Sequence, residues 1–415
     1  MTTLLKNAFL IDGTGAAPAG LTDIVLSDGK IKSVELSASG LANTPDNDAD
    51  TVFDLRGKTV LPGLIDAHTH FGGTDRLDYP GITDRHENYD YLNSRKDALK
   101  WGITTVRSAG DYVPDILDFR DEVDAGLHTS PKIIAAGRMF QAAGGHPLDT
   151  VFGHDPGIAS GVIIAVGEDT DLEKEVAGLA DAGSDWIKVF ISEVNKMDYP
   201  AKVPRIPKEK IKRIAELAHK HDKPCMIHVD NLSQLREAAE AGADSIEHIF
   251  AVGATDTELP DDLLELLKDR GTYIVPTMYS IKAHEALDDT RPPVYEKLVA
   301  VVARMLEAGI KITAGCDSGI PFVPLGESIH CELEELVRAG MSPMAAILAA
   351  TSQNAKMLRI DNDRGQILPG KAADLVILGA NPLEDIANTR KIEIVILNGR
   401  IVIDRRERGE FCNGR

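Results

Sequence analysis

Two different patterns of apolar and polar positions divide the chain. Towards both ends, short β-rich runs are separated by Gly and Asp turn signals, as in strands joined by tight turns. In the middle, short apolar runs alternate with segments of helical period, among them 208–222, 232–243 and 261–271. The apolar runs of the middle part lie at 63–70, 103–110, 132–137, 186–192, 225–230, 245–250, 273–278 and 311–319.

Strands that alternate with helices in this way predict an α/β fold, the parallel (β/α)8 TIM barrel. A doubly wound open sheet has the same periodicity and is the structural alternative. The β-rich runs at the two ends predict a small β-sandwich domain built from residues 1–60 plus 362–415, with the barrel at 61–361. The polar stretch 37–50 is expected to be a surface loop.

Charge and composition exclude several classes of partner. The 415 residues carry 45 basic and 65 acidic side chains, a net charge of −20, which would repel nucleic acids and anionic membranes. The apolar runs are shorter than the ~20 residues of a membrane span, and no signal-peptide pattern is seen at the start. Four scattered cysteines without a CxxC pair indicate free thiols. We therefore expect a cytoplasmic protein that acts on a small molecule, as a homo-oligomer by default.

Candidate chemistry lies at or near the ends of the predicted strands. Two histidines spaced i, i+2 place both rings on one face of a strand, where they can hold one ion. Each candidate alone has an ordinary structural explanation, such as a snorkelling lysine or a helix-capping aspartate. In a barrel, however, the carboxyl ends of all strands open onto one face, so the set predicts one site. Its members are His68, His70, Lys188, His228, His248 and Asp317.

With these motifs, the chain resembles the amidohydrolase superfamily. The resemblance is to members with a carboxylated lysine that are related to Xaa-Pro dipeptidases and imidazolonepropionase-like hydrolases, and it covers nearly the whole chain. It is carried by LPGLIDAHTHF (61–71), GHP (145–147), WIKVF (186–190), IHVDN (227–231), SIEHIF (245–250), TAGCDSG (313–319), TSQNAKMLRI (351–360) and GQILPGKAADLVIL (365–378).

The resemblance implies a binuclear metal centre with two divalent ions, zinc being expected. His68, His70 and Asp317 would hold the more buried ion, and His228 with His248 the more exposed one. Lys188 would bridge both ions as a CO2-derived carbamate. A metal-bridging hydroxide would attack an amide, cyclic amide or peptide-like C–N bond, with Asp317 as the proton shuttle.

Substrate contacts are also predicted. His146, in the GHP motif, matches a family position near the substrate, although an ordinary loop histidine is the alternative. Asp230 occupies a position where dipeptide-cleaving relatives often have Tyr. Its carboxylate would repel a free C-terminus, unless Asp230 or Asn231 only caps the helix that follows. Tyr279 and Arg107 are further candidates for the pocket wall.

Two alternative functions remain open. One is a mononuclear, imidazolonepropionase- or deaminase-like hydrolase of the same superfamily, against which Lys188 argues. The other is a non-catalytic homologue that serves as an oligomeric scaffold, against which the complete ligand set argues. Metal content of about two, one or zero ions per chain would separate these hypotheses.

Overall fold

The structure is a computed structural model and describes residues 2–37, 49–56, 58–72, 91–151, 156–196, 200–287 and 291–406. Most of the polar stretch 37–50, and Cys412, lie outside these ranges. Cys225 and Cys316 are buried and Cys331 is half-buried, and all three are free thiols, as expected.

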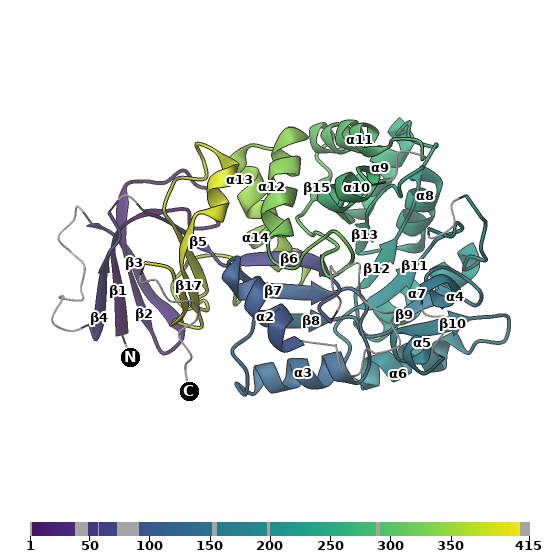
Figure 1. Ribbon diagram of the computed structural model, residues 1–415, viewed down its shortest axis with the longest axis horizontal. Coiled ribbons are helices and arrows are strands. Elements are labelled where there is room, and N and C mark those ends of the chain that lie inside the picture. Colours follow the sequence, from purple (N-terminus) through teal and green to yellow (C-terminus); the bar gives the residue numbers. More distant parts are fainter. Residues whose placement is uncertain are drawn as a thin grey trace.

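Strands from the two chain ends combine in one mixed sheet (Figure 1). Among the described residues, its order is β18-β17-β16-β5-β1-β2-β3, with β4 paired to β1. The two chain ends meet where β16 runs antiparallel to β5. Alternate apolar residues, such as Leu5, Ile24 and Ile377, form a core belonging to this sheet. The strands are β1 Thr2–Leu10, β2 Leu21–Ser27, β3 Lys30–Leu36, β4 Thr51–Asp54, β5 Thr59–Pro62, β16 Leu375–Leu378, β17 Ile392–Leu397 and β18 Arg400–Asp404.

The middle of the chain forms parallel strands with helices around them (Figure 1). Each of the predicted apolar runs contains a strand. Two strands, β9 and β10, were not predicted; β9 pairs with both β10 and β11. The strands are β6 Leu64–Thr69, β7 Ile103–Ser108, β8 Lys132–Ala135, β9 Met139–Ala142, β10 Ile163–Val166, β11 Ile187–Phe190, β12 Cys225–His228, β13 Ser245–Glu247, β14 Tyr273–Val275 and β15 Lys311–Ile312.

Backbone hydrogen bonds join the first of these parallel strands to the segment that follows the last one. The amide of Ala67 in β6 donates to the carbonyl of Ala314, and the amide of Asp317 donates to the carbonyl of His68. Thr69 and Ser318 form a parallel bridge. This pairing argues against the doubly wound open sheet. The α/β fold with parallel sheets is confirmed, whereas a closed barrel and a second layer in the terminal domain stay predictions.

Amphipathic helices pack on the parallel strands. The predicted helix at 208–222 is α7, which buries Ile211, Ile214 and Leu217. The predicted helices at 232–243 and 261–271 are α8 and α9. The helices are α2 Tyr91–Lys100, α3 Asp115–Asp124, α4 Leu148–Val151, α5 Pro156–Val162, α6 Leu172–Asp181, α7 Lys208–Lys220, α8 Leu232–Ala241, α9 Asp261–Arg270, α10 Met278–Glu285, α11 Tyr295–Glu307, α12 Ser328–Arg338, α13 Pro343–Ala349, α14 Ser352–Met357 and the 3-10 helix η4 Ile386–Arg390.

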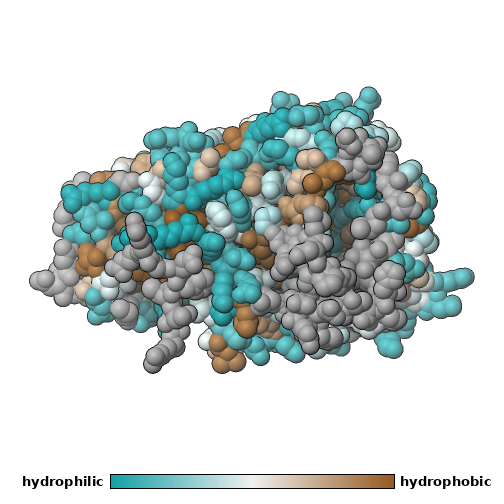
Figure 2. All heavy atoms as spheres, in the orientation of Figure 1, coloured by the Kyte–Doolittle hydropathy of each residue, from teal (hydrophilic) through white to brown (hydrophobic). Residues whose placement is uncertain are grey.

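The described residues on one face of the molecule are mostly polar. Figure 2 shows hydrophilic residues over much of one face, with apolar residues in small separate groups. Within the described ranges, no helix has both the length and the hydropathy needed to cross a bilayer.

Candidate metal centre

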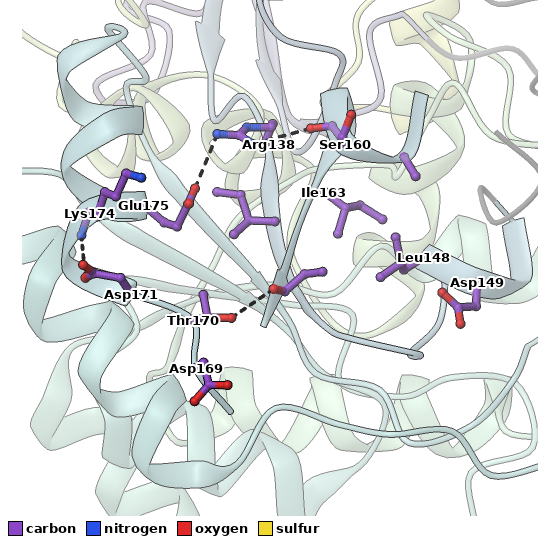
Figure 3. A pocket seen from close by; sticks show the side chains of 13 residues that line it. Arg138, Leu148, Asp149, Ser160, Ile163, Asp169, Thr170, Asp171, Lys174 and Glu175 are labelled. Atoms are coloured by element: carbon purple, nitrogen blue, oxygen red, sulfur yellow. Dashed lines mark hydrogen bonds and ion pairs between the residues drawn. The ribbon is translucent and has the colours of Figure 1, made fainter. Parts of the chain in front are cut away.

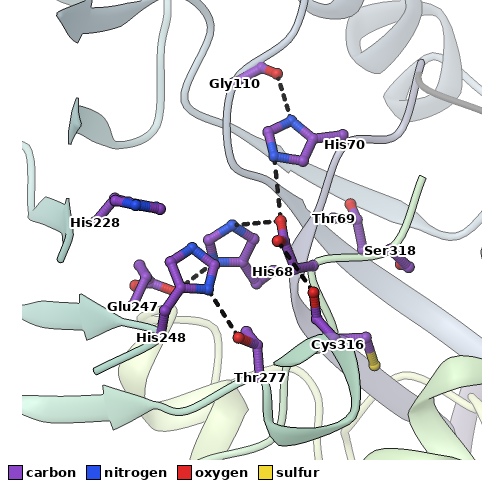
Figure 4. A network of polar contacts seen from close by, with 12 residues as sticks. His68, Thr69, His70, Gly110, His228, Glu247, His248, Thr277, Cys316 and Ser318 are labelled. Atoms are coloured by element: carbon purple, nitrogen blue, oxygen red, sulfur yellow. Dashed lines mark hydrogen bonds and ion pairs between the residues drawn. The ribbon is translucent and has the colours of Figure 1, made fainter. Parts of the chain in front are cut away.

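Three predicted ligands converge where β6 meets the segment after β15 (Figure 4). His68 and His70 come from the end of β6, and Asp317 follows β15. The Oδ1 atom of Asp317 lies 3.3 Å from Nε2 of His68 and 3.3 Å from Nε2 of His70. One ligand atom from each of the three residues lies within 4.8 Å of the others. The i, i+2 spacing thus places both rings at one point, as predicted.

The hydrogen bonds of these rings leave their lone pairs facing the same point. Nδ1 of His70 lies 2.9 Å from the carbonyl oxygen of Gly110, and Nδ1 of His68 lies 2.6 Å from Oε2 of Glu247. Both partners are acceptors, so Nδ1 carries the hydrogen and a neutral ring keeps its lone pair on Nε2. Nε2 of His68 is buried and has no hydrogen-bond partner. An unpaired buried acceptor that faces a carboxylate fits a metal cation.

Asp317 is suited to hold a cation. Burial alone would raise the pKa of its carboxyl group, but the neighbouring rings of His248, His68 and His70 hold that pKa well below its ordinary value. The carboxylate is therefore ionised across the neutral pH range. Its Oδ2 atom lies 3.5 Å from Oγ of Ser280, at the start of α10.

His228 and His248 lie beside this cluster. The ring centroid of His248 lies 4.8 Å from that of His68 and 4.4 Å from that of His228. Nδ1 of His248 contacts the Thr277 hydroxyl at 2.7 Å. Burial lowers the pKa of His228 to about 3 and that of His248 well below its usual value, so both rings are neutral. Neutral imidazoles are the form that binds metals.

Lys188 is fully enclosed in β11, between β9 and β12. It is 1% exposed, and its register partners are Met139 and Met226. Burial lowers the pKa of its ammonium group to about 8. The predicted ligand positions thus share one region of the fold, although their roles as ligands stay predictions.

A buried ion pair between Arg107 and Glu247, which the sequence analysis missed, contacts His68 at its Nδ1 atom. Oε1 of Glu247 accepts hydrogen bonds from Nη2 of Arg107 at 2.9 Å and from Oγ of Ser245 at 2.5 Å. Burial opposes ionisation of Glu247, yet the Arg107 charge and the His68 hydrogen bond hold its pKa at about 2. The Arg107 guanidinium lies over the Trp186 ring at 4.5 Å. Arg107 therefore belongs to this network, and its predicted contact with substrate stays a prediction.

Asp230 lies beside His228 and a lysine that was not predicted. Its Oδ1 atom is 2.9 Å from Nε2 of His228 and 2.9 Å from Nζ of Lys196. The α8 cap is Asn231, whose side chain accepts from the Gln234 amide. Of the two capping alternatives, the structure selects Asn231. The adjacent Lys196 ammonium opposes the repulsion that the Asp230 carboxylate alone would exert on a substrate carboxylate.

His146 and Tyr279 lie near the edges of this region. His146 is buried with its ring centroid 6.1 Å from that of Phe190, and burial, with the nearby Lys196 charge, lowers its pKa to about 3. Tyr279 is half-buried, and burial together with a hydrogen bond to Cys331 raises its pKa to about 12. The predicted contacts of His146 and Tyr279 with the substrate stay predictions.

Three residues of the site have strained backbone conformations. His248, Thr277 and Asp317 have φ angles of 81°, 47° and 59°, which non-glycine residues rarely adopt. Such conformations persist where surrounding contacts enforce them, and they are concentrated at functional sites.

A separate cavity of about 660 Å³ runs along β10 (Figure 3). Its wall combines the apolar side chains of Leu148 and Ile163 with the Arg138–Glu175 ion pair. Its lining does not include the predicted site residues.

Comparisons with known proteins agree with this architecture. The Amidohydrolase family model matches residues 59–402. An uncharacterized protein from Mycobacterium tuberculosis is 27% identical over 370 residues, covering 87% of this chain and 89% of the relative. Ochratoxinase from Aspergillus niger is 26% identical over 368 residues, covering 80% of this chain and 72% of the relative.

Among solved structures, a Xaa-Pro dipeptidase with bound methionine in the active site superposes with a TM-score of 0.81 at 26% identity. The superposition covers 97% of this chain and 99% of the dipeptidase chain, which supports a TIM-barrel-like α/β fold. Because the family model spans most of the sequence, this chain belongs to the amidohydrolase family and is a hydrolase that acts on C–N bonds.

Proposed function

We propose that this protein is a binuclear metal-dependent amidohydrolase that cleaves an amide, cyclic amide or peptide-like bond of a small molecule. The observation that carries the proposal is the buried, unpartnered Nε2 atom of His68, which faces the ionised carboxylate of Asp317 at 3.3 Å. Two acceptors in this arrangement need a cation or a proton between them, and a metal ion that also binds His70 meets this need.

The residues divide into two ligand groups. His68, His70 and Asp317 would hold one divalent ion, and His228 with His248 a second. When bound, such ions supply Lewis acidity that polarises a carbonyl and makes water more acidic. Imidazole nitrogens and carboxylate oxygens suit zinc. Nε2 of His228 contacts both Asp230, at 2.9 Å, and Nζ of Lys196, at 3.1 Å, so Nδ1 of His228 would be the ligand atom.

Lys188 would supply the anion that the neutral imidazoles lack. In its neutral form, the Nζ atom attacks CO2, an N–C bond forms and a proton is released to water, which leaves a carbamate with two ligand oxygens. Support for this comes from its position: an enclosed amine on the strand between β9 and β12 has little use as a cation beside two metal ions.

Asp317 would move the proton during hydrolysis. Its carboxylate, held ionised, accepts a proton from the attacking water and delivers it to the leaving nitrogen. His146 would bind the substrate near the scissile bond. The strained backbone conformations of Asp317 and His248 would fix the positions of their own side chains before the substrate binds. The proposal includes a closed (β/α)8 barrel, supported by the pairing of β6 with the segment after β15.

The test combines metal analysis with a substrate screen. Protein purified without chelator should contain about two ions per chain, and it should hydrolyse some of a panel of N-acyl amino acids, dipeptides, hydantoins and lactams. Lys188→Ala should lose metal and activity, with partial recovery on adding a small carboxylic acid. One ion per chain would favour the mononuclear hydrolase, and a metal-free, inactive chain would favour the scaffold. An unmodified ammonium at Lys188 in a metal-loaded crystal would disprove the carbamate.

A further inference from the structure

The carboxylate of Glu247 joins two groups that lie far apart in the sequence. Its Oε2 atom accepts the hydrogen of His68 Nδ1 at 2.6 Å, and its Oε1 atom accepts from Arg107 and Ser245. The side chains of His68, Arg107 and Glu247 are all 0% exposed. Each oxygen of Glu247 thus has its own donors, and water does not reach them.

The Arg107 side of the network is itself fixed. Nε of Arg107 donates to the carbonyl oxygen of Ala67, the residue before His68, at 2.6 Å. Nη1 donates to Oγ of Ser245 at 2.9 Å, and the guanidinium lies over Trp186. Arg107 therefore connects the backbone of β6 with the β13 residue that contacts the His68 ring.

We infer that Glu247 is a positioning residue: it keeps the hydrogen of His68 on Nδ1 and turns the Nε2 lone pair towards Asp317. This inference rests on the proposed function, in which His68 is a metal ligand. Ligating histidines commonly donate their other ring hydrogen to a carboxylate, and loss of that partner typically weakens metal binding 10–100-fold. Glu247 lies one residue before the predicted ligand His248 and was not itself predicted.

The variant E247Q tests the inference because an amide cannot serve both sides. Only one of its two terminal atoms is an acceptor. If the amide nitrogen faces His68, the ring must move its hydrogen to Nε2 and loses the ligand lone pair. If the nitrogen faces Arg107 instead, two donors meet in a buried space. The more conservative E247D keeps two acceptor oxygens and should retain the Nδ1 hydrogen with a smaller loss.

The first measurement is made on metal-free protein. Nitrogen-15 NMR of labelled histidines, with His68 assigned from an H68Q sample, reports which ring nitrogen carries the hydrogen. We expect Nδ1–H in the wild type and in E247D, and an Nε2–H population in E247Q. The second measurement is zinc affinity by competition with a chelator, where E247Q should bind 10–100-fold more weakly.

A matched control separates positioning from general damage. Asp374 is another buried carboxylate paired with an arginine, Arg364, but it lies directly before β16 of the terminal sheet. D374N should lower the melting temperature and leave both the His68 tautomer and the zinc affinity unchanged. The inference is overturned if E247Q keeps the hydrogen on Nδ1 with wild-type affinity, or, should E247Q not fold, if E247D shifts the hydrogen to Nε2. If the wild type binds no metal, the proposed function fails, while the tautomer still shows whether Glu247 sets His68.

Discussion

Nε2 of His68, whose side chain is fully buried, and Oδ1 of Asp317, whose side chain is 15% exposed, lie 3.3 Å apart, and in the neutral tautomer that Glu247 favours both atoms are acceptors. In water each atom would bind a donor, but the Nε2 atom has no partner here. Burying two facing acceptors without a cation or proton between them costs free energy of folding. The same pair that suits the proposed metal site would therefore lower the stability of the protein when no metal is bound.

Metal removal should for this reason destabilise the protein. A bound ion at 100 times its dissociation constant adds about 2.7 kcal/mol to the free energy of unfolding, because it binds the folded chain preferentially. Dialysis against a chelator should lower the melting temperature, and added zinc should restore it. Magnesium, which prefers oxygen ligands, serves as the control and should not restore it. Equal melting temperatures with and without chelator would contradict the metal centre.

Asp317→Asn should harm turnover far more than folding. Asparagine tolerates the left-handed backbone found at this position, where φ is 59°, and keeps the side-chain shape. Its amide cannot accept the proton, so kcat should fall by roughly 10²–10⁴-fold. The check is kcat measured alongside metal content and melting temperature. Near-normal kcat in a metal-loaded, folded variant would rule out the proton-shuttle role.

The strands that carry the proposed metal ligands were predictable because the signal was local. His68, His70 and Asp317 each close an apolar run, and parallel strands bring their carboxyl ends together. The structure places them within reach of one ion, as that geometry requires. The unpredicted strands β9 and β10 are short, at four residues each, and β9 follows β8 after only a few residues, so the periodicity did not separate them.

The supporting residues were harder to predict because their partners are remote. Glu247 and Arg107 are 140 positions apart, and each looks like an isolated charge near the end of an apolar run. Two opposite charges inside buried strands are a usable signal, since neither is stable there without a partner. Lys196 gives no such signal, because it follows β11 in a segment without periodicity. Its place beside Asp230 depends on tertiary structure alone.

A buried histidine outside the metal centre predicts a pH effect on stability. His330 in α12 contacts Thr389 and the Trp101 carbonyl, and burial lowers its pKa to about 3. Unfolded histidine binds a proton near pH 6.5, so the unfolded chain holds more protons between these values. Stability contributed by neutral His330 is therefore complete above pH 6.5 and is lost as the pH falls towards 3, by at most about 1.4 kcal/mol per pH unit.

Urea unfolding of the metal-free protein at pH 7 and pH 5 measures this slope. His330→Gln should be less stable at pH 7, but it should lose less stability than the wild type between the two pH values, by up to about 2 kcal/mol. Working without metal removes the pH dependence of ligand binding from the comparison. An identical slope in both proteins would show that His330 does not contribute.

The last prediction concerns Lys196, Asp230 and the charge of the substrate. Lys196 is 30% exposed while Asp230 is 6% exposed, so the ammonium forms the outer side of their ion pair. Together they are close to neutral, and the repulsion expected from Asp230 alone is largely cancelled. Lys196→Met would leave the negative carboxylate unbalanced, whereas Asp230→Asn would leave the ammonium. The two variants should therefore change substrate preference in opposite directions.

The quantity to measure is kcat/KM for a substrate with a free carboxylate, divided by kcat/KM for its amide counterpart. Lys196→Met should lower this ratio and Asp230→Asn should raise it, each by roughly 5–30-fold, the effect of about 1–2 kcal/mol from one partly exposed charge. Asp230 also bonds to His228, so its removal can weaken metal binding by that histidine. A loss of metal lowers both kcat/KM values by the same factor and therefore cancels in their ratio. The double variant restores neutrality and should return the ratio to near the wild-type value. If both single variants leave the ratio unchanged, the pair does not face the substrate, and Asp230 serves only to orient His228.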